Sequence, residues 1–220
     1  MADRTAYAHS GAEKLLAPAL QHRACVIFDD FAPNPKFADV IRGVKLWYER
    51  PCDIILAAGG GSAIDMAKLI GLCAGDQEPY RELLTCDRPI VHQSIPLIVI
   101  PTTAGTGSEA THFAVVYIDG QKYSVAHEYV LPEYAIIDSN LTASLPATIT
   151  AHTGLDALAQ AIESLWSVNA TEESREFASE AVTLVLKNLE VAVHNPTSAA
   201  RFDMCRAAHL AGKAIIWLLP

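Results

Sequence analysis

Three consecutive glycines stand where a short apolar run gives way to a helical pattern, in DIILAAGGGSAIDMAK at residues 53–68. Glycine lets a ligand approach the backbone closely, and the first N–H groups of a helix lack partners inside it and attract an anion. Gly59, Gly60 and Gly61 therefore predict a pyrophosphate-binding turn, with Ser62 capping the helix and offering its hydroxyl. The alternative is a tight strand-to-helix turn that binds nothing.

This turn matches neither of the two common nucleotide motifs. The dinucleotide fingerprint G-x-G-x-x-G needs a glycine where this chain has Ile64. A P-loop needs Gly-Lys followed by Ser or Thr, whereas Gly212 and Lys213 are followed by Ala214. The prediction of an anion site therefore depends on the glycine run and the helix that follows it.

A second glycine-containing loop follows another apolar run, in LIVIPTTAGTGSEAT at residues 97–111. Thr102, Thr103, Thr106 and Ser108 offer hydroxyl groups beside two glycines, which suits a ribose or a phosphate. A polar surface loop without a ligand is the alternative. Both loops would follow the carboxyl ends of parallel strands, where open α/β sheets bind ligands. We therefore expect them to form one nucleotide site.

The third pattern is GLDALAQAIES at residues 154–164. Asp156 and Gln160 are four residues apart, so on a helix they share one face and could hold one metal ion. The common alternative is a solvated face. His152 lies one turn before Asp156 and could extend the set, although a helix-end histidine is the usual interpretation. No nucleophile motif is present, so the catalytic residue is unknown from the sequence.

The surrounding pattern indicates an α/β half followed by helices alone, with a boundary near 139–146. Buried strands are expected at 24–28, 53–58, 97–100 and 134–138, and a hairpin at Asp119-Gly120. Helices are expected after a Ser10–Glu13 capping box, after Asn34 as a cap, and at 62–73. Three more helices are expected at 147–168, 172–193 and 198–215. The predicted domains are 1–144, an α/β dinucleotide-binding domain, and 145–220, a helical metal-binding domain.

The composition of the chain limits the classes of binding partner and the compartment that can be expected. The chain has 220 residues, is 51% hydrophobic and carries a net charge of −9. An acidic balance argues against nucleic acid or an anionic membrane as partner. The five cysteines form no C-x-x-C pair, which favours buried thiols in a reducing compartment. Without an apolar signal core or a membrane-spanning run, the expected location is the cytoplasm.

Taken together and in this order, these motifs resemble the iron-containing (group III) alcohol dehydrogenase family. The resemblance extends from about Ser10 to Lys213. The matching segments are PNP at 33–35, GGGSAIDMAK at 59–68, PTTAGTGSEAT at 101–111, Lys122 on the hairpin, and LPATITAHTGLDALAQAIES at 145–164. The wording QAIES and SLWS is similar to the phosphonoacetaldehyde reductase subgroup.

The resemblance implies a Rossmann-like, dehydroquinate synthase-like cofactor domain followed by an all-helical domain. It implies an NAD(P)-dependent oxidoreductase that interconverts small alcohols with aldehydes or ketones, with a divalent metal, iron or zinc, as Lewis acid. A homo-oligomer is expected. The metal ligands would be Asp156 and Gln160, the latter standing where the family has histidine. The cofactor-contacting positions would be Asn34, Gly60, Gly61, Ser62, Thr102, Thr103, Phe113 and Lys122.

Departures from the family pattern predict an incomplete enzyme. Members of the family open with a further strand, and two more histidine ligands lie beyond the last matching segment. We therefore expect a cofactor domain without its first strand, a truncated helical domain, an incomplete metal site and little turnover by this chain alone. The alternative is a non-catalytic nucleotide-binding or dimerising remnant. The loop at residues 102–111, called the threonine loop below, and the Asp-x-x-x-Gln spacing both disfavour a relative of dehydroquinate synthase or glycerol dehydrogenase.

Overall fold

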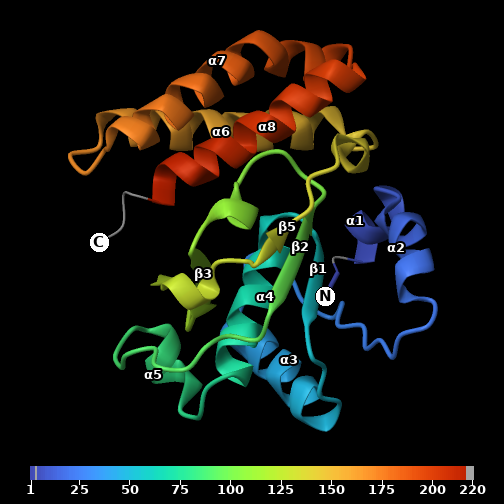
Figure 1. Cartoon of the computed structure of the whole chain (residues 1–220), viewed down its shortest axis with the longest axis vertical. Coiled ribbons are helices and arrows are strands. Elements are labelled where there is room, and N and C mark those ends of the chain that lie inside the picture. Colours follow the sequence, from blue (N-terminus) through green and yellow to red (C-terminus); the bar gives the residue numbers. More distant parts are fainter. Residues whose placement is uncertain (3, 217–220) are drawn as a thin grey trace.

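The computed structural model of the chain describes residues 1–2 and 4–216. A layer of three helices, α6, α7 and α8, lies over an α/β part that contains the sheet and α4 (Figure 1). The sheet is parallel in the order β1-β2-β5. Its strands are β1 (Ile55–Gly59), β2 (Leu97–Pro101) and β5 (Tyr134–Ala135). The predicted fold class, α/β followed by a helical portion, is confirmed.

The central strands form because their residues are almost continuously apolar. Ile55 pairs with Leu97 and Gly59 with Pro101, in parallel register. Both strands have one half-buried residue among four buried ones, as expected for parallel strands covered on both faces. Helix α4 (Gly61–Ala74) follows β1 at once and returns across the sheet. This arrangement puts both glycine loops at the carboxyl end of the sheet.

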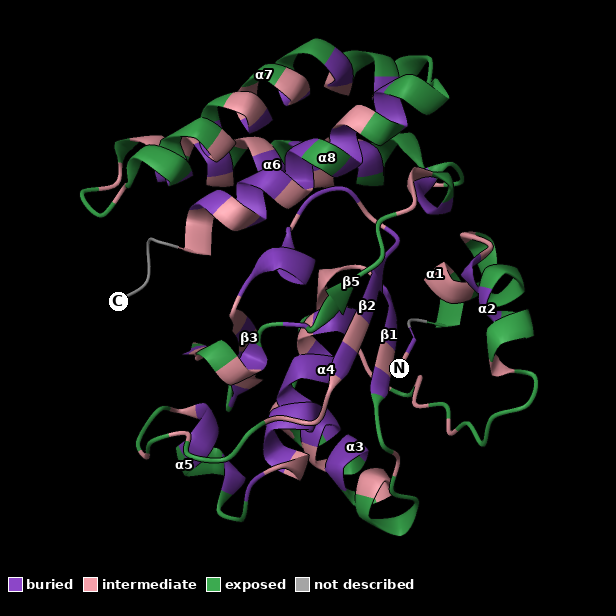
Figure 2. Ribbon diagram, viewed as in Figure 1, coloured by how far each residue is buried: buried purple, intermediate pink, exposed green. Residues whose placement is uncertain are grey.

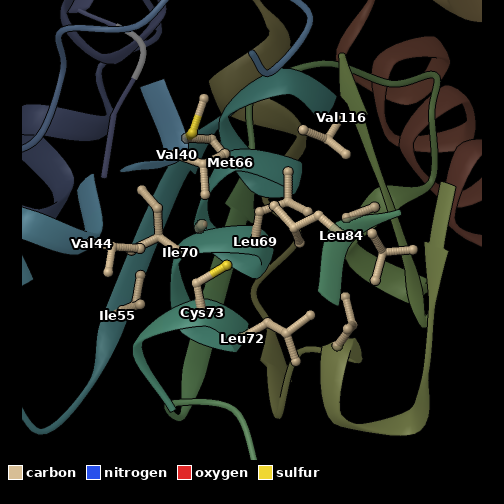
Figure 3. Packing of buried hydrophobic residues seen from close by; sticks show 14 of the residues in the cluster. Val40, Val44, Ile55, Met66, Leu69, Ile70, Leu72, Cys73, Leu84 and Val116 are labelled. Atoms are coloured by element: carbon tan, nitrogen blue, oxygen red, sulfur yellow. The ribbon is translucent and has the colours of Figure 1, made fainter. Parts of the chain in front are cut away.

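The main apolar core forms around α4. Ten residues of α4 are buried, from Ala63 to Cys73, and the helix is almost wholly purple in Figure 2. Its side chains contact residues of β1, β2 and α3 (Phe37–Glu49) on one side and of the hairpin on the other, as Figure 3 shows for part of the cluster. Leu69 and Leu72 are fully buried there. The position of α4 therefore depends on apolar contacts from both sides.

The predicted hairpin is confirmed. Strands β3 (Phe113–Ile118) and β4 (Gln121–Ala126) are antiparallel, with Ile118 opposite Gln121. Asp119 and Gly120 have φ values of 51° and 81°, the left-handed geometry that two-residue hairpin turns require.

The three C-terminal helices are also confirmed, as α6 (Ala147–Trp166), α7 (Glu172–His194) and α8 (Ser198–Ile215). Thr171 caps α7 and exchanges hydrogen bonds with Ser174. The core between these helices is rich in alanine, because small side chains let helix backbones approach closely. No described helix is long and apolar enough to cross a membrane.

Two predicted strands are wrong. Residues 24–28 form no strand, and Ile27 is 66% exposed. Ala2 instead bridges Ala58 in parallel, and its N–H donates to the Phe28 oxygen, 3.2 Å away, so the chain start occupies the edge of β1. Of residues 134–138, only Tyr134 and Ala135 form a strand, β5, and both are exposed rather than buried.

Several local predictions are also wrong. Helix α3 begins at Phe37 with Lys36 as its cap, while Asn34 has φ 62° and caps nothing. The helix expected after Ser10 is present as α2 (Ala12–Leu20), but its N-cap is Gly11 and the predicted capping box does not form. Helix α1 (Arg4–His9) was not predicted. Helix α5 (Tyr80–Leu84) was not predicted. The cysteines are not all buried either, because Cys25 and Cys86 are exposed.

Replacing Leu69 by alanine should lower the free energy of unfolding by about 2–5 kcal/mol, because it removes a fully buried side chain from the core around α4. Leu186→Ala, at a position that is 70% exposed, is the matched control and should change it by less than about 0.5 kcal/mol. Urea denaturation followed by circular dichroism measures both. Equal effects of the two substitutions would contradict the assignment of this core.

Candidate nucleotide-binding site

The two glycine loops meet at the carboxyl end of β1 and β2. The Thr102 N–H donates to the Gly59 oxygen, 2.9 Å away, which continues the parallel ladder one residue beyond the strands. Gly60 is the N-cap of α4, and no side chain caps this helix start. The predicted capping role of Ser62 is therefore wrong. A helix start that no side chain caps is suited to binding an anion.

Glycine is required in the turn because the threonine loop packs directly on it. A Cβ on Gly61 would lie 2.6 Å from Cγ2 of Thr106, and one on Gly60 would lie 3.3 Å from the Thr103 side chain. The first of these distances is shorter than any normal contact between such atoms. Glycine at positions 60 and 61 therefore allows the turn to pack directly against the threonine loop.

Ser62 and Asn34 come together although they are far apart in the chain. The Asn34 N–H donates to Oγ of Ser62 over 3.1 Å. Asn34 is exposed beside the start of α4. The Ser62 hydroxyl keeps its own hydrogen available for a ligand.

Thr102 carries an unsatisfied polar group. Its side chain is 1% exposed, and its Oγ1 is buried without a hydrogen-bond partner. A buried hydroxyl without a partner costs about 1–3 kcal/mol and calls for an explanation such as a missing ligand. Thr103, its neighbour, is half-buried against Gly60. The threonines thus lie where the sequence analysis expected a ribose- or phosphate-binding loop.

Phe113 and Lys122 lie on the hairpin that follows the loop. Phe113 is half-buried at the start of β3, and Lys122 is exposed on β4 opposite Tyr117. Burial raises the pKa of the Asp65 carboxyl on α4, and the Lys122 charge is among the smaller effects that oppose this rise. Lys122 is therefore near Asp65, in the first half of α4.

Lys68 was missed by sequence reasoning, yet it organises the loop. Its side chain is 1% exposed. Its Nζ donates to the backbone oxygens of Ser108, Thr111 and Phe113 at 2.7, 2.8 and 2.8 Å, and to Oγ1 of Thr111 at 3.1 Å. Burial lowers the pKa of Lys68 to about 8, with Asp65 and Glu109 opposing the shift. One ammonium group thus holds the end of the threonine loop.

Asp65 completes this link one turn earlier on α4. Its Oδ1 accepts the Ser108 hydroxyl at 2.6 Å and its Oδ2 accepts the Val115 N–H at 3.0 Å. Burial raises the pKa of Asp65, while the Lys68 charge opposes that rise. The sequence signal was available: two charged residues three apart inside an otherwise apolar helix need buried partners.

The predicted metal ligands lie on α6, one helical face with Thr153. Thr153 packs on the threonine loop, because a Cβ on Gly105 would lie 2.5 Å from the Thr153 Cβ. Asp156 is exposed, and Oε1 of Gln160 is buried without a partner. His152 is exposed.

These donors do not complete a metal site. Within residues 1–2 and 4–216, His, Cys, Asp and Glu form no group of three that could hold a metal ion. Iron and zinc bind best to three or four ligands that include imidazole or thiolate. One exposed carboxylate and one amide oxygen supply less than this.

A sizeable cavity lies elsewhere among the described residues. It has a volume of about 320 Å³ and is lined by Ala67 and by residues 93–97 and 128–133. Residues 93–97 lie before and at the start of β2, and residues 128–133 lie just before β5. The cavity is therefore at the amino ends of these strands, opposite the end that carries the glycine loops. We place the candidate site at the loops, because the cavity has neither the glycine turn nor the free helix start that an anion needs.

Replacing Lys68 by methionine should lower the free energy of unfolding by about 2–4 kcal/mol at pH 7.5, because three buried carbonyl oxygens lose their donor. The folded pKa of about 8 lies below the ordinary value of 10.5. The unfolded chain therefore binds this proton more tightly between those pH values. The Lys68 contribution to stability should rise across that window by on the order of 3 kcal/mol.

Urea denaturation of the wild type and of Lys68→Met from pH 7.5 to pH 10 measures this difference. Lys14→Met, at an exposed position, is the control and should follow the wild type at every pH. Parallel curves for wild type and Lys68→Met would show that Lys68 keeps its ordinary pKa in the folded protein.

Comparison with known proteins adds independent findings. The family model "Iron-containing alcohol dehydrogenase" matches residues 1–139, and "Fe-containing alcohol dehydrogenase family, C-terminal" matches residues 150–216. Among curated relatives, long-chain-alcohol dehydrogenase 1 of Geobacillus thermodenitrificans is 38% identical over 192 residues, which is 86% of this chain and 48% of that protein. The NAD-dependent methanol dehydrogenase of Bacillus methanolicus is 38% identical over 194 residues, which is 86% of this chain and 50% of that protein.

A solved structure agrees with these relatives. Sulfoacetaldehyde reductase from Bifidobacterium kashiwanohense, in complex with NAD⁺, superposes with a TM-score of 0.92 at 33% identity, covering 98% of this chain and 58% of that one. The chain thus spans about half the length of the curated relatives it matches. The chain belongs to the iron-containing alcohol dehydrogenase family.

Proposed function

We propose that residues 1–144 form a dinucleotide-binding domain that binds NAD(P), and that residues 145–220 form a helical domain beside it. The observation that carries the proposal is the contact between the glycine turn and the threonine loop, beside an uncapped helix start. The unpartnered Thr102 hydroxyl supports it. So does the NAD⁺ complex of the structural relative.

Each residue of the site has a proposed role. Gly60 and Gly61 let the pyrophosphate reach the N–H groups at the start of α4. Ser62, Thr102 and Thr103 bind phosphate or ribose oxygens through their hydroxyls. The three remaining cofactor contacts surround this cradle: Asn34, Phe113 and Lys122.

The proposed reaction of the whole enzyme is the interconversion of a small alcohol and its aldehyde. The nicotinamide, when bound, supplies or accepts the hydride. What this chain contributes is binding and orientation of the dinucleotide and exclusion of water from the loop that Lys68 holds. A phosphonate- or sulfonate-bearing aldehyde is the proposed substrate class, by similarity to phosphonoacetaldehyde reductases and to the sulfoacetaldehyde reductase.

The proposed metal site is less complete than the nucleotide site. Asp156 and Gln160 are the proposed ligands for iron or zinc in this chain, and the described residues do not complete their site. We assign no step to a metal on this donor set. A second candidate function follows, namely a nucleotide-binding remnant without turnover, and the two isolated oxygen donors favour it for this chain taken alone.

Two further properties stay predictions. All five cysteines are free, and Cys25 and Cys86 are exposed, which fits the proposed reducing, cytoplasmic setting. A homo-oligomer is proposed as well, and small-molecule substrates are its expected partners rather than nucleic acid or membrane.

Isothermal titration with NADH and NADPH tests cofactor binding. The wild type should bind one of them, and Gly61→Asp should abolish the heat, because its side chain collides with Thr106 and sets a carboxylate where the phosphate binds. Gly71→Ala is the control on the same helix, since its Cβ would meet only ordinary contacts at 3.4 Å or more. Circular dichroism confirms that each variant is folded. No heat from the wild type at millimolar nucleotide would refute the proposal.

Turnover distinguishes the enzyme from the remnant. The purified chain with added Fe²⁺ or Zn²⁺ should show no loss of NADH absorbance with small aldehydes, because its metal donors are too few. The opposite outcome is turnover that disappears in Asp156→Ala and persists in Glu163→Ala, a control carboxylate exposed on the same helix. That result would establish catalysis by this chain.

A further inference from the structure

The threonine loop has a second contact surface, on the side away from the glycine turn. Figure 1 shows the chain rising from β2 to a point beneath α8 and returning to β3. Gly107, with φ 60°, lies against Gly212 of α8. A Cβ on Gly212 would lie 2.5 Å from the Gly107 oxygen, and one on Gly107 would lie 2.6 Å from the Gly212 Cα. The two backbones are therefore in direct contact.

One polar interaction joins the same two elements. Nδ1 of His209, on α8, donates to Oε1 of Glu109 over 3.3 Å. The Glu109 side chain is 5% exposed and that of His209 is 32% exposed. Since α8 makes a full turn in about 3.6 residues, His209 and Gly212 lie on the same face. This face of α8 meets the loop through backbone contacts of Gly107 with Ala208 and Gly212 and through the buried Glu109 carboxylate.

Glu109 interacts with both α8 and the Lys68 ammonium. It belongs to the short helix η1 (Ser108–Ala110), and Lys68 donates to backbone oxygens on either side of it, those of Ser108 and Thr111. The Glu109 carboxylate thus accepts from His209 and is also attracted by the Lys68 ammonium. Moving α8 would change the surroundings of this buried charge, which cannot be left unpaired without cost.

We infer that His209 and Gly212 of α8 are positioning residues for the threonine loop, so that the docking of α8 and the binding of NAD(P) are coupled. The inference rests on the proposed function. α8 acts through Gly107 and Glu109, which are not among the proposed cofactor contacts. Coupling is reciprocal: if docked α8 favours the binding-competent loop, bound nucleotide favours docked α8 by the same free energy.

A purely structural role predicts something different. If α8 only covers the loop, its variants lower overall stability and leave the folded loop and its nucleotide affinity unchanged. Positioning predicts a folded protein whose loop amides exchange faster. It also predicts rescue by a side chain that keeps the one hydrogen bond, since the Asn amide can place a donor near the Nδ1 position of histidine.

Hydrogen exchange of the nucleotide-free protein is the first test. His209→Ala should raise the exchange of amides at 105–111 at least about tenfold, and His209→Asn should restore most of the protection. Arg206→Ala is the matched control, because Arg206 lies on α8 with 53% exposure and pairs with Glu180 of α7. It should leave the loop unchanged. Equal exchange in wild type and His209→Ala would overturn the inference.

Calorimetry with NADH is the second test. His209→Ala should weaken binding about tenfold, within the usual range of coupling between two sites. Gly212→Ala, which forces the backbones apart, should weaken it at least as much. Exchange at α8 should fall when NADH binds to the wild type. A dissociation constant unchanged in both variants would overturn the inference.

The two failures are distinguishable. If the wild type binds no nucleotide, the proposed function fails, and the exchange experiment still decides whether α8 positions the loop. If the wild type binds and neither variant changes exchange or affinity, the proposed function stands and the coupling is refuted.

Discussion

The site depends on one buried ammonium group. Moving a lysine out of water is costly unless its donors find well-placed acceptors. Lys68 solves this with three backbone oxygens and one hydroxyl, drawn from Ser108, Thr111 and Phe113. Those acceptors converge only if the chain from 108 to 113 curls around the Nζ atom. The path of the threonine loop, and of the hairpin that continues it, is therefore fixed from beneath by a residue of α4.

The glycines follow from that constraint. The threonine loop, whose end is bound by Lys68, also contacts the glycine turn, α6 and α8. Each contact is a place where a Cβ does not fit, at Gly61 against Thr106, at Gly105 against Thr153 and at Gly212 against Gly107. Glycine is thus used here for close approach, and only Gly107 among these also needs a positive φ.

Features that depend on local sequence patterns could be predicted, whereas contacts between distant segments could not. The strands β1 and β2, the Asp119-Gly120 turn and the three long helices depend on patterns a few residues long, and they were predicted well. Residues 24–28 look like a strand locally, but the chain start takes the neighbouring position beside Ala58. The types of site residue were readable as well. Their partners were not, because the ligands of Lys68 lie 40 to 45 positions away and no spacing rule reports them.

The predicted metal ligands show the same difference between local and non-local information. Spacing alone shows that Asp156 and Gln160 share a helix face, and Thr153 connects that face to the loop through Gly105. Whether such a pair holds a metal depends on donors from other segments, and among the described residues His, Cys, Asp and Glu form no group of three that could hold one. The glycine turn, the threonine loop and Lys68 all come from residues 59–113, so the proposed nucleotide site needs no metal donor. Binding of a nucleotide and turnover are therefore separate properties of this chain and must be measured separately.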